Sequence, residues 1–320
     1  MRAVVQDEYG EAHDVLRVAE IDQPVIAADE VLVRVHAAGV DRGAWHLMAG
    51  MPYPVRMATG LGKPKTPVRG RDLAGRVEAV GAAVTTLSPG DEVFGIGEGS
   101  FAEFARAKAA KLVARPENLT PVQAAALPIS GLTALQSVRD RAKVQAGQKV
   151  LVIGASGGVG AFAVQVAKAR GAHVTGLCST AKVDLVRSLG ADEVLDYTKD
   201  PIGGPYDVII DTGGHRTLRT LRRALTPRGH AVIVGSETGG RILGGFQRAL
   251  WAPLMSLFIS QKLLGQVSAE RQEDLQELAT LAATGTIFAP IDRTYPLEET
   301  AAAIQQMQDG KVRGKVVVVI

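Results

Sequence analysis

The first third of the chain alternates apolar and other residues with the period of a β-strand. Valine stands at every second position over residues 31–35, so one face of a strand in this range is expected to be buried. The turn sequence Ser-Pro-Gly-Asp follows at 88–91, ahead of a short apolar run at 93–95. Short strands separated by such turns predict a compact, β-rich domain.

From residue 149 the pattern changes to buried strands that alternate with amphipathic helices. Residues 150–153 are wholly apolar, as in a strand that is covered on both faces of a parallel sheet. A helix with one apolar face follows, and Gly171 is well placed to end it. Further strands are expected at 173–178, 193–197, 207–211 and 231–235. This repetition predicts a parallel α/β sheet with right-handed crossover connections.

Helix signals flank the α/β region on both sides. Thr120 can cap a helix, Pro121 suits its first position, and Gln123 completes a capping box. Near the end of the chain, a helical stripe of apolar residues (297–307) precedes an apolar final strand (316–320). The pattern of apolar positions at the end of the chain therefore differs from the α/β pattern of its middle.

These changes of pattern divide the 320 residues into two domains, a number that suits this length. Residues 1–125 and 268–320 are expected to form one domain, and residues 126–267 the α/β domain. The 36 basic and 33 acidic side chains are interspersed, which argues against nucleic-acid binding. The single cysteine, Cys178, excludes an intramolecular disulfide and a zinc site of four thiolates. We expect a reducing, cytoplasmic environment, and the N-terminus carries no leader pattern.

An uncharged segment at residues 249–261 raises the question of a membrane span. It is shorter than the roughly 20 apolar residues that a spanning helix needs, and Pro253 interrupts it early. We expect this segment to wall a substrate pocket or to form a dimer contact, since an exposed apolar patch of this size is unusual. A role at a membrane surface is the alternative.

The most informative stretch reads Gly154-Ala155-Ser156-Gly157-Gly158-Val159-Gly160 and lies between a buried strand and an amphipathic helix. In the G-x-G-x-x-G frame, Ala155, Gly157 and Gly160 take the three key positions. Gly157 would let the backbone approach a pyrophosphate, and Gly160 would let the helix and strand pack closely. The helix N-terminus offers amides and a positive dipole end to the phosphates. We predict a dinucleotide-binding loop formed by Ala155, Ser156, Gly157, Gly158, Val159 and Gly160.

The residues after the second strand of this region indicate which dinucleotide is bound. NAD sites usually place a carboxylate about 20 residues beyond the loop, to hold the ribose 2′-OH. Here Ser179, Thr180 and Lys182 stand at that place, and the next carboxylate is Asp184, on the following helix. Hydroxyls and an ammonium suit a 2′-phosphate, so NADPH is predicted, with Ser179 and Lys182 as ligands. The alternative is that Ser179 caps a helix and Lys182 is a solvated charge.

Several short motifs occur in a fixed order along the chain. They are residues 70–75 with 80–81, 90–93, 131–134, the glycine-rich loop, 189–192 and 313–316. In this order and spacing the sequence resembles the medium-chain dehydrogenase/reductase superfamily, in its zinc-free quinone oxidoreductase (zeta-crystallin-like) branch, over essentially the whole chain.

The resemblance implies an α/β fold with a GroES-like, β-rich catalytic domain, built from both chain ends, and a Rossmann doubly wound parallel-sheet cofactor domain between them. It also implies a homodimer joined through the cofactor domains. Thr133 is expected beside the nicotinamide and Tyr197 near the adenosine ribose. Lys315, in the C-terminal Arg-Gly-Lys run, is expected to approach the cofactor.

Three departures from the zinc-dependent members are visible. Arg71 stands where they carry a metal-binding histidine, Asp41 stands where they carry a cysteine ligand, and Gly43 replaces the hydroxyl residue of their proton relay. A tetrahedral catalytic zinc needs three protein ligands, so zinc-independent chemistry is predicted. Arg71 and Asp72 are expected to form an ion pair in place of the lost metal site.

Without a Lewis acid the substrate must accept hydride readily, so we predict an NADPH:quinone reductase that acts on a quinone or another conjugated carbonyl. Asp41, His46 and Tyr53, with Trp45 nearby, are the catalytic candidates, and Tyr53 or His46 could donate a proton to the carbonyl oxygen. The alternatives are a 2-alkenal or enone double-bond reductase, and a non-catalytic protein that binds NADPH or RNA.

Overall fold

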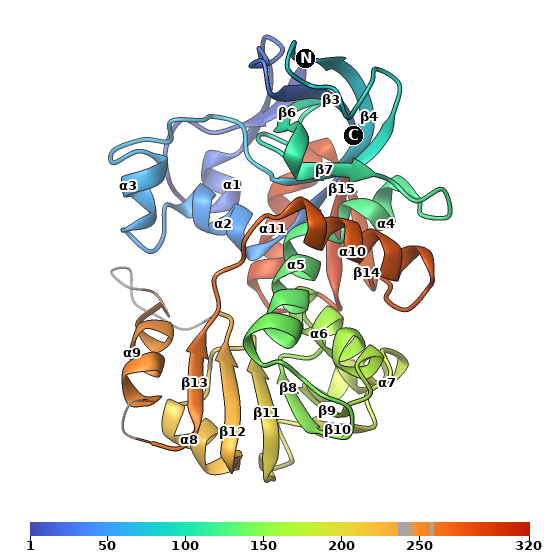
Figure 1. Cartoon of the computed structure of the whole chain (residues 1–320). Helices are drawn as coiled ribbons and strands as arrows, with labels where there is room; N and C mark the ends of the chain where they lie inside the picture. The colour runs from blue at the N-terminus through green and yellow to red at the C-terminus, as the bar shows by residue number, and fades with distance from the viewer. Residues whose placement is uncertain (236–243, 245, 257–258) are drawn as a thin grey trace. The chain divides into compact units, whose positions relative to one another are not determined.

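The computed structural model describes residues 1–235, 244, 246–256 and 259–320. The chain divides into two compact units (Figure 1). The terminal unit comprises Met1–Ile129 and Glu270–Ile320, and the central unit comprises Ser130–Ala269. The central unit is therefore one continuous segment, whereas the terminal unit needs both ends of the chain.

A seven-stranded sheet forms the centre of the terminal unit. Its longest strand, β3 (Glu30–Val40), pairs antiparallel with β4 (Asp72–Val80), β6 (Phe104–Lys108) and β15 (Lys315–Val319). The last strand of the chain thus lies between β3 and β14. The other strands of this sheet are β5 (Glu92–Ile96), β7 (Leu112–Ala114) and β14 (Ile291–Pro296), and β1 (Arg2–Val5) pairs with β2 (Arg17–Glu20) in a separate sheet.

The core of the terminal unit follows the alternation in the sequence. Val31, Val33 and Val35 of β3 are each at most 2% exposed, which confirms the buried face predicted for this strand. The capping box at Thr120 is also present, since its hydroxyl accepts from the Gln123 amide and the Gln123 side chain accepts from the Thr120 amide. The helices of this unit are α1 (Ala12–Val15), α2 (Arg42–Ala49), α3 (Val55–Thr59), α4 (Pro121–Ala125), α10 (Gln272–Ala283) and α11 (Thr300–Gln308).

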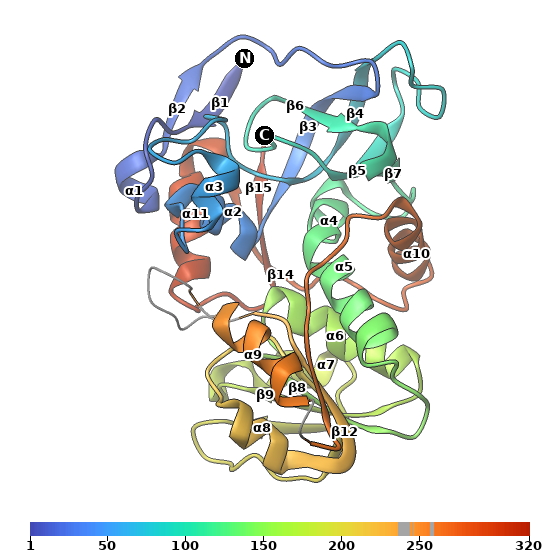
Figure 2. The ribbon, with the colours of Figure 1, turned by 60° about the vertical axis from the view of Figure 1, so that its left-hand side comes forward.

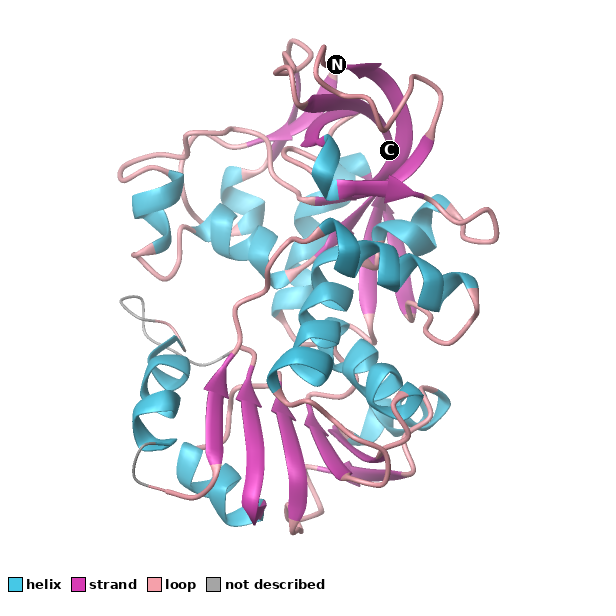
Figure 3. Ribbon diagram, viewed as in Figure 1, coloured by secondary structure: helices cyan, strands magenta, loops and turns pink. Residues whose placement is uncertain are grey.

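The central unit contains a six-stranded parallel sheet, in the order β10-β9-β8-β11-β12-β13 (Figure 3). From β8 the chain moves outward through β9 and β10, then continues on the other side with β11, β12 and β13. The reversal lies between β8 and β11, and sheets of this kind bind ligands at the carboxyl ends of the strands beside such a reversal. The strands are β8 (Lys149–Ile153), β9 (His173–Cys178), β10 (Glu193–Asp196), β11 (Tyr206–Asp211), β12 (Leu225–Ile233) and β13 (Lys262–Gly265).

The helices of the central unit connect these strands. Figures 1 and 2 both show α8 and α9 next to one another along the same side of the sheet. Helix α5 crosses the boundary between the units and continues as a π-helical turn (Ser137–Arg141). The helices are α5 (Pro128–Gln136), α6 (Gly158–Ala169), α7 (Val183–Ser188), α8 (Leu218–Ala224) and α9 (Phe246–Ser256).

The β-rich unit and the doubly wound parallel sheet confirm the predicted α/β fold class. One expectation was wrong in detail, because Pro253 lies inside α9 instead of interrupting the segment 249–261 early. The sequence patterns also gave no indication of strand β13. Two residues of that segment, at 257–258, lie outside the described part of the chain. Within α9, the exposed side chains include Leu250, Trp251 and Leu254.

Candidate cofactor and active site

A sharp turn joins β8 to α6 at the carboxyl edge of the central sheet. Gly154 begins it with φ at +78°, and a Cβ there would lie 2.6 Å from the Thr212 hydroxyl oxygen. The sequence frame placed Ala155 first, but the structure gives the tight-turn role to Gly154. Ala155 is fully buried, and its amide donates to the carbonyl oxygen of Leu177. The turn is thereby tied to β9.

The other glycines of the turn differ sharply in what surrounds them. A Cβ on Gly160 would lie 2.0 Å from the Gly154 carbonyl oxygen, so the first turn of α6 packs directly on backbone. A Cβ on Gly157 would meet one atom, the same oxygen, at 3.4 Å. Gly157 is the N-cap of α6 and supplies no side-chain cap, so the first-turn amides of Gly158 and Val159 face no capping group. This geometry fits a pyrophosphate at the helix N-terminus.

The end of β9 forms the next part of the candidate cofactor site. Ser179 precedes a short 3₁₀ turn (Thr180–Lys182) but makes no side-chain cap bond with it, contrary to the capping alternative. Ser179 and Lys182 are both partly exposed. Tyr197 follows β10, is 53% exposed, and its amide donates to the Cys178 carbonyl oxygen. The ends of β9 and β10 therefore bring Ser179 and Tyr197 to the same edge of the sheet.

A carboxylate that the sequence reasoning missed also lies at this edge. Asp196 ends β10 opposite Cys178, and its side chain is buried. It accepts hydrogen bonds from the hydroxyls of Thr180 and Thr198 and from the Thr198 amide, and Lys199 lies 3.5 Å away. The bond from the Thr180 hydroxyl is the largest cause of a lowered Asp196 pKa. The Thr180 hydroxyl is therefore engaged, and Ser179 and Lys182 remain as the candidate ligands of a 2′-phosphate.

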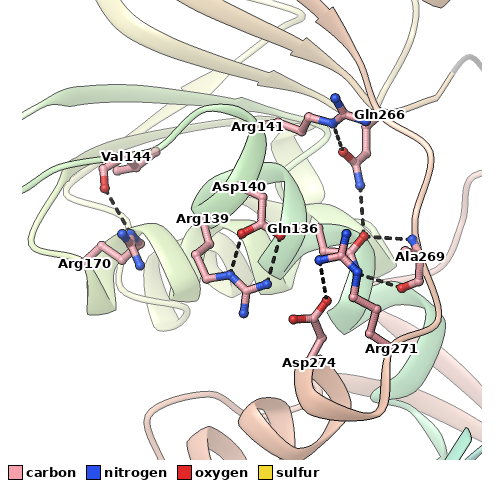
Figure 4. Close-up of polar contacts among 10 residues, drawn as sticks. All are labelled: Gln136, Arg139, Asp140, Arg141, Val144, Arg170, Gln266, Ala269, Arg271 and Asp274. Carbon is pink, nitrogen blue, oxygen red and sulfur yellow. Dashed lines mark hydrogen bonds and ion pairs between the residues drawn. The ribbon is translucent and has the colours of Figure 1, made fainter. Parts of the chain in front are cut away.

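Thr133, on α5, has a partner that the sequence did not indicate. The Ser268 hydroxyl donates to the Thr133 hydroxyl oxygen at 2.9 Å, and Thr133 is partly exposed. The neighbouring Gln136 holds the segment after β13. Its side chain donates to the Ala269 carbonyl at 2.7 Å and accepts from the Ala269 amide at 2.9 Å, as Figure 4 shows. The segment that carries Ser268 is thus fixed to α5.

In the terminal unit, Asp41 lies at the start of α2 and caps it. One carboxylate oxygen accepts from the Ala44 amide at 3.0 Å. The other oxygen is buried and has no hydrogen-bond partner within the described residues, and the side chain as a whole is 5% exposed. Four residues further along the helix, the Trp45 indole N–H is likewise buried without a partner in this part of the chain.

His46 and Tyr53 lie in different surroundings. The His46 Nδ1 lies 2.7 Å from the Met51 carbonyl oxygen, which can only accept, so Nδ1 carries the hydrogen and Nε2 of the neutral ring is an acceptor. Burial lowers the pKa of His46 from its usual value. Tyr53 is 42% exposed, and the Arg56 guanidinium lies 5.0 Å from its ring centre.

Asp72 and Lys315 form a buried ion pair at the start of β4 and β15. Their Oδ2 and Nζ atoms are 3.4 Å apart, and the ammonium also donates to the Val40 carbonyl at 3.0 Å. The other Asp72 oxygen accepts from the Ile129 amide. Burial raises the pKa of the Asp72 carboxyl to about 7, against the lowering effect of Lys315. Lys315 is 2% exposed, which gives it a role inside the terminal unit; an approach to a cofactor stays a prediction.

The prediction of an ion pair between Arg71 and Asp72 was wrong, because each side chain has another partner. Arg71 pairs with Glu270 at 2.5 Å, and Lys111 binds the other oxygen of the same carboxylate at 2.5 Å. Asp72 pairs with Lys315 instead, because its side chain points into the core of the unit. Asp72 is fully buried whereas Arg71 is partly exposed, so the two side chains meet different partners.

Two features are absent from the described residues. No cluster of three or more His, Cys, Asp or Glu side chains in this part of the chain is arranged to hold a metal ion. Among the same residues, the helices include none with the length and apolar character needed to cross a bilayer.

Comparisons with known proteins agree with this architecture. Residues 27–117 match the family model of the alcohol dehydrogenase GroES-like domain, and residues 189–318 match that of a zinc-binding dehydrogenase. The chain is 31% identical to the chloroplast envelope quinone oxidoreductase homolog of Arabidopsis thaliana, over 99% of this chain and 98% of that protein. It is 35% identical to the trans-enoyl reductase pgmF of Aspergillus terreus, over 92% and 87% of the two chains. A mycobacterial protein solved in complex with NADPH has a similar structure, with a TM-score of 0.85, 28% identity and full coverage of both chains.

The fold and the glycine turn define an NAD(P)H-dependent oxidoreductase. The chain belongs to the medium-chain dehydrogenase/reductase superfamily, in its quinone oxidoreductase branch. The predicted family and enzyme class are thereby confirmed.

Proposed function

We propose that the protein uses NADPH to reduce a quinone or a similar conjugated carbonyl compound, without zinc. The observation that carries this proposal is the turn from β8 to α6, where backbone contact at Gly160 and open space at Gly157 leave room for a pyrophosphate. The bound nicotinamide would supply the hydride. The residues of the chain bind and orient the two reactants.

The choice of NADPH rests on the rim formed by Ser179, Lys182 and Tyr197. Ser179 makes no cap bond, so its hydroxyl can face a 2′-phosphate. Lys182 supplies positive charge at the same turn. The Asp196 carboxylate lies close by, but four donors surround it and hold it inward. A phosphate therefore meets hydroxyl and ammonium groups first.

On the nicotinamide side, we assign Thr133 to contact with the ring. Its hydroxyl oxygen accepts from the Ser268 hydroxyl at 2.9 Å, which helps to hold the Thr133 side chain in place. The Gln136 contacts with Ala269 hold Ser268 in reach. This pair is suited to position a carboxamide and a reacting ring within a narrow range of geometry.

Zinc independence rests on the identity of the side chains that stand at the ligand positions. Arg71 is committed to Glu270, and Asp41 caps α2. Neither arrangement leaves three ligands for a tetrahedral ion. A quinone needs no Lewis acid, because the charge that arrives with hydride delocalises onto its carbonyl oxygens.

We assign the proton donation to Tyr53. A neutral His46 with Nδ1–H bound to Met51 offers only an acceptor at Nε2. The Tyr53 hydroxyl has no partner within the described residues and is exposed, so it can reach a substrate oxygen. Asp41 acts as a positioning residue, since its carboxylate fixes the start of the helix that carries His46.

A double-bond reductase is the second candidate function, favoured by the 35% identity to a trans-enoyl reductase. The two functions are separated by following NADPH oxidation with a panel of simple quinones and with an enal, and by identifying the products. Quinol formation supports the proposal, and saturated aldehyde without quinone turnover supports the second candidate. No oxidation with any acceptor would overturn both. A homodimer and a cytoplasmic location remain predictions.

A further inference from the structure

Basic and acidic side chains are interspersed over most of the sequence, but residues 212–269 depart from this pattern. Residues 212–269 hold eight basic side chains and a single acidic one, although the whole chain has a net charge of only +3. Five of these cations are arginines at 216, 219, 222, 223 and 228, with no carboxylate among them. The charge therefore gathers on α8 and the turns beside it.

Arginines elsewhere in the described chain are commonly matched with carboxylates, as in the pairs Arg2–Glu103 and Arg106–Glu98. Arg219 and Arg223 have no ion pair or hydrogen bond to any described residue, and both are exposed. They lie one turn apart on α8, and like charges at this spacing repel by a few tenths of a kcal/mol. An anion between them would relieve that repulsion.

Arg219, Arg222 and Arg223 are among the residues that line an open pocket of about 480 Å³. The pocket lies where α8 ends and where β12 and β13 begin. These strands run parallel to β8, so the pocket lies at their amino ends, and the glycine turn lies at the carboxyl edge of the sheet (Figure 1). The pocket is therefore separate from the candidate cofactor site.

Gln261 holds together the elements that surround this pocket. Its side chain is 9% exposed, and its amide nitrogen donates to the carbonyls of Arg222 and Thr226 at 3.0 and 3.2 Å. The bond to Arg222 satisfies a carbonyl at the negative, C-terminal end of α8, which would otherwise oppose an anion, and the bond to Thr226 ties Gln261 to β12. The Gln261 oxygen accepts from Arg222 Nε at 3.2 Å and so fixes the orientation of that guanidinium.

We propose that this arginine pocket binds a phosphate group at a second site, independent of the cofactor. Guanidinium groups present planar pairs of donors that match the oxygens of a phosphate, and three of them around one concavity suit a dianion. Both a free phosphate compound and a phosphate headgroup of a lipid carry this chemistry. The proposal does not depend on which nicotinamide or which acceptor the enzyme uses.

The test compares R223Q, which loses a pocket arginine, with R228Q, which loses an exposed arginine of the same segment outside the pocket lining. Inorganic pyrophosphate is titrated into the full chain by calorimetry. Wild type and R228Q should both bind pyrophosphate at the arginine pocket. R223Q should weaken this binding roughly tenfold or more, and R219Q/R223Q should abolish it. NADPH affinity should be equal in all four proteins. Equal pyrophosphate binding in R223Q and R228Q would overturn the proposal.

Two further readouts complete the test. Pyrophosphate should raise the Tm of wild type and R228Q but not of R219Q/R223Q, whose own Tm without ligand should not fall, because the lost charges repel one another. Sedimentation with phosphatidic acid vesicles, with phosphatidylcholine vesicles as control, distinguishes a headgroup from a free phosphate compound. Binding that depends on Arg223 in either arm supports the pocket. A lower ligand-free Tm in R219Q/R223Q would show that these arginines are structural.

Discussion

Asp72 and Lys315, 243 positions apart in the sequence, form an ion pair in the core of the terminal unit, with neither side chain more than 2% exposed. The pair joins the start of β4 to the start of β15, and the ammonium also binds the last residue of β3. Buried pairs of this kind add little net stability over apolar residues, but removing one partner leaves an uncompensated charge.

Replacing Lys315 with Met should therefore destabilise the protein by about 3–5 kcal/mol in denaturant unfolding at neutral pH. The double variant D72N/K315M removes both charges and should recover part of this loss, since the two effects are coupled. If the losses of the single variants simply add in the double variant, the ion pair has no energetic role.

The same pair gives stability a pH dependence with a definite sign. Burial raises the pKa of Asp72 in the folded state from 3.8 to about 7, so the folded state holds a proton that the unfolded state releases. The contribution of Asp72 is fully present below pH 4 and is lost as the pH rises through about 7. K315M should thus lose more stability at pH 8 than at pH 5, measured by urea unfolding at both values. The D72N background should abolish this difference.

The two glycines of the cofactor turn should respond differently to the same substitution. Gly160→Ala places a Cβ 2.0 Å from backbone, so it should lower the Tm of the protein even without ligand. Gly157→Ala meets one atom at 3.4 Å and should leave the Tm close to that of wild type. It should nevertheless weaken NADPH binding by roughly tenfold or more, because the methyl group occupies the space of the pyrophosphate. Calorimetry and thermal unfolding separate the two effects.

The preference for NADPH should depend on Lys182. Lys182→Ala should weaken NADPH binding by roughly tenfold or more and leave NADH binding nearly unchanged, because only NADPH carries the 2′-phosphate. Lys149→Ala is the matched control, since Lys149 is an exposed lysine at the start of β8, at the opposite edge of the sheet. Equal losses for NADPH and NADH in K182A would place the 2′-phosphate elsewhere.

Tyr53→Phe should lower kcat by about 100-fold without changing the affinity for the cofactor, as expected for loss of a proton donor. Burial lowers the pKa of His46, so its imidazole should titrate below the usual value of 6.5 in an NMR titration. His46→Gln should then leave the pH profile of kcat unchanged above pH 6. If one limb of the wild-type pH profile disappears in H46Q, the proton donor is His46 and not Tyr53.

The local elements of the fold were largely predictable, because each rests on a short-range pattern. The strand at His173–Cys178 and the cap at Thr120 follow from alternation and from a single side chain that bonds to a backbone amide three residues later. Strand β13 escaped prediction because its four residues follow an uncharged segment with no change of period. The glycine turn was recognised, but the role of Gly154 depends on Thr212, which lies 58 positions away.

The contacts of the site could not be predicted for the same reason. Charge alone suggested that Arg71 would pair with its neighbour Asp72, yet the partners are Glu270 and Lys315, which the fold brings in from the far end of the chain. Asp196 could not be predicted from spacing after the glycine turn, since it stands on the following strand and only the pairing of β9 with β10 places it beside Cys178. Sequence spacing describes one strand at a time, whereas these contacts cross between strands.

The position of β15 has a consequence for synthesis of the protein on the ribosome. This strand comes from the last six residues of the chain, yet it lies between β14 and β3 inside the sheet. The central unit can be completed as soon as residue 269 has emerged, but the sheet of the terminal unit stays open until residue 319 has emerged. Loss of residues 315–319 would therefore leave β3 with an unpaired edge, which is a surface prone to aggregation, and would do more harm than the distance of β15 from the glycine turn suggests.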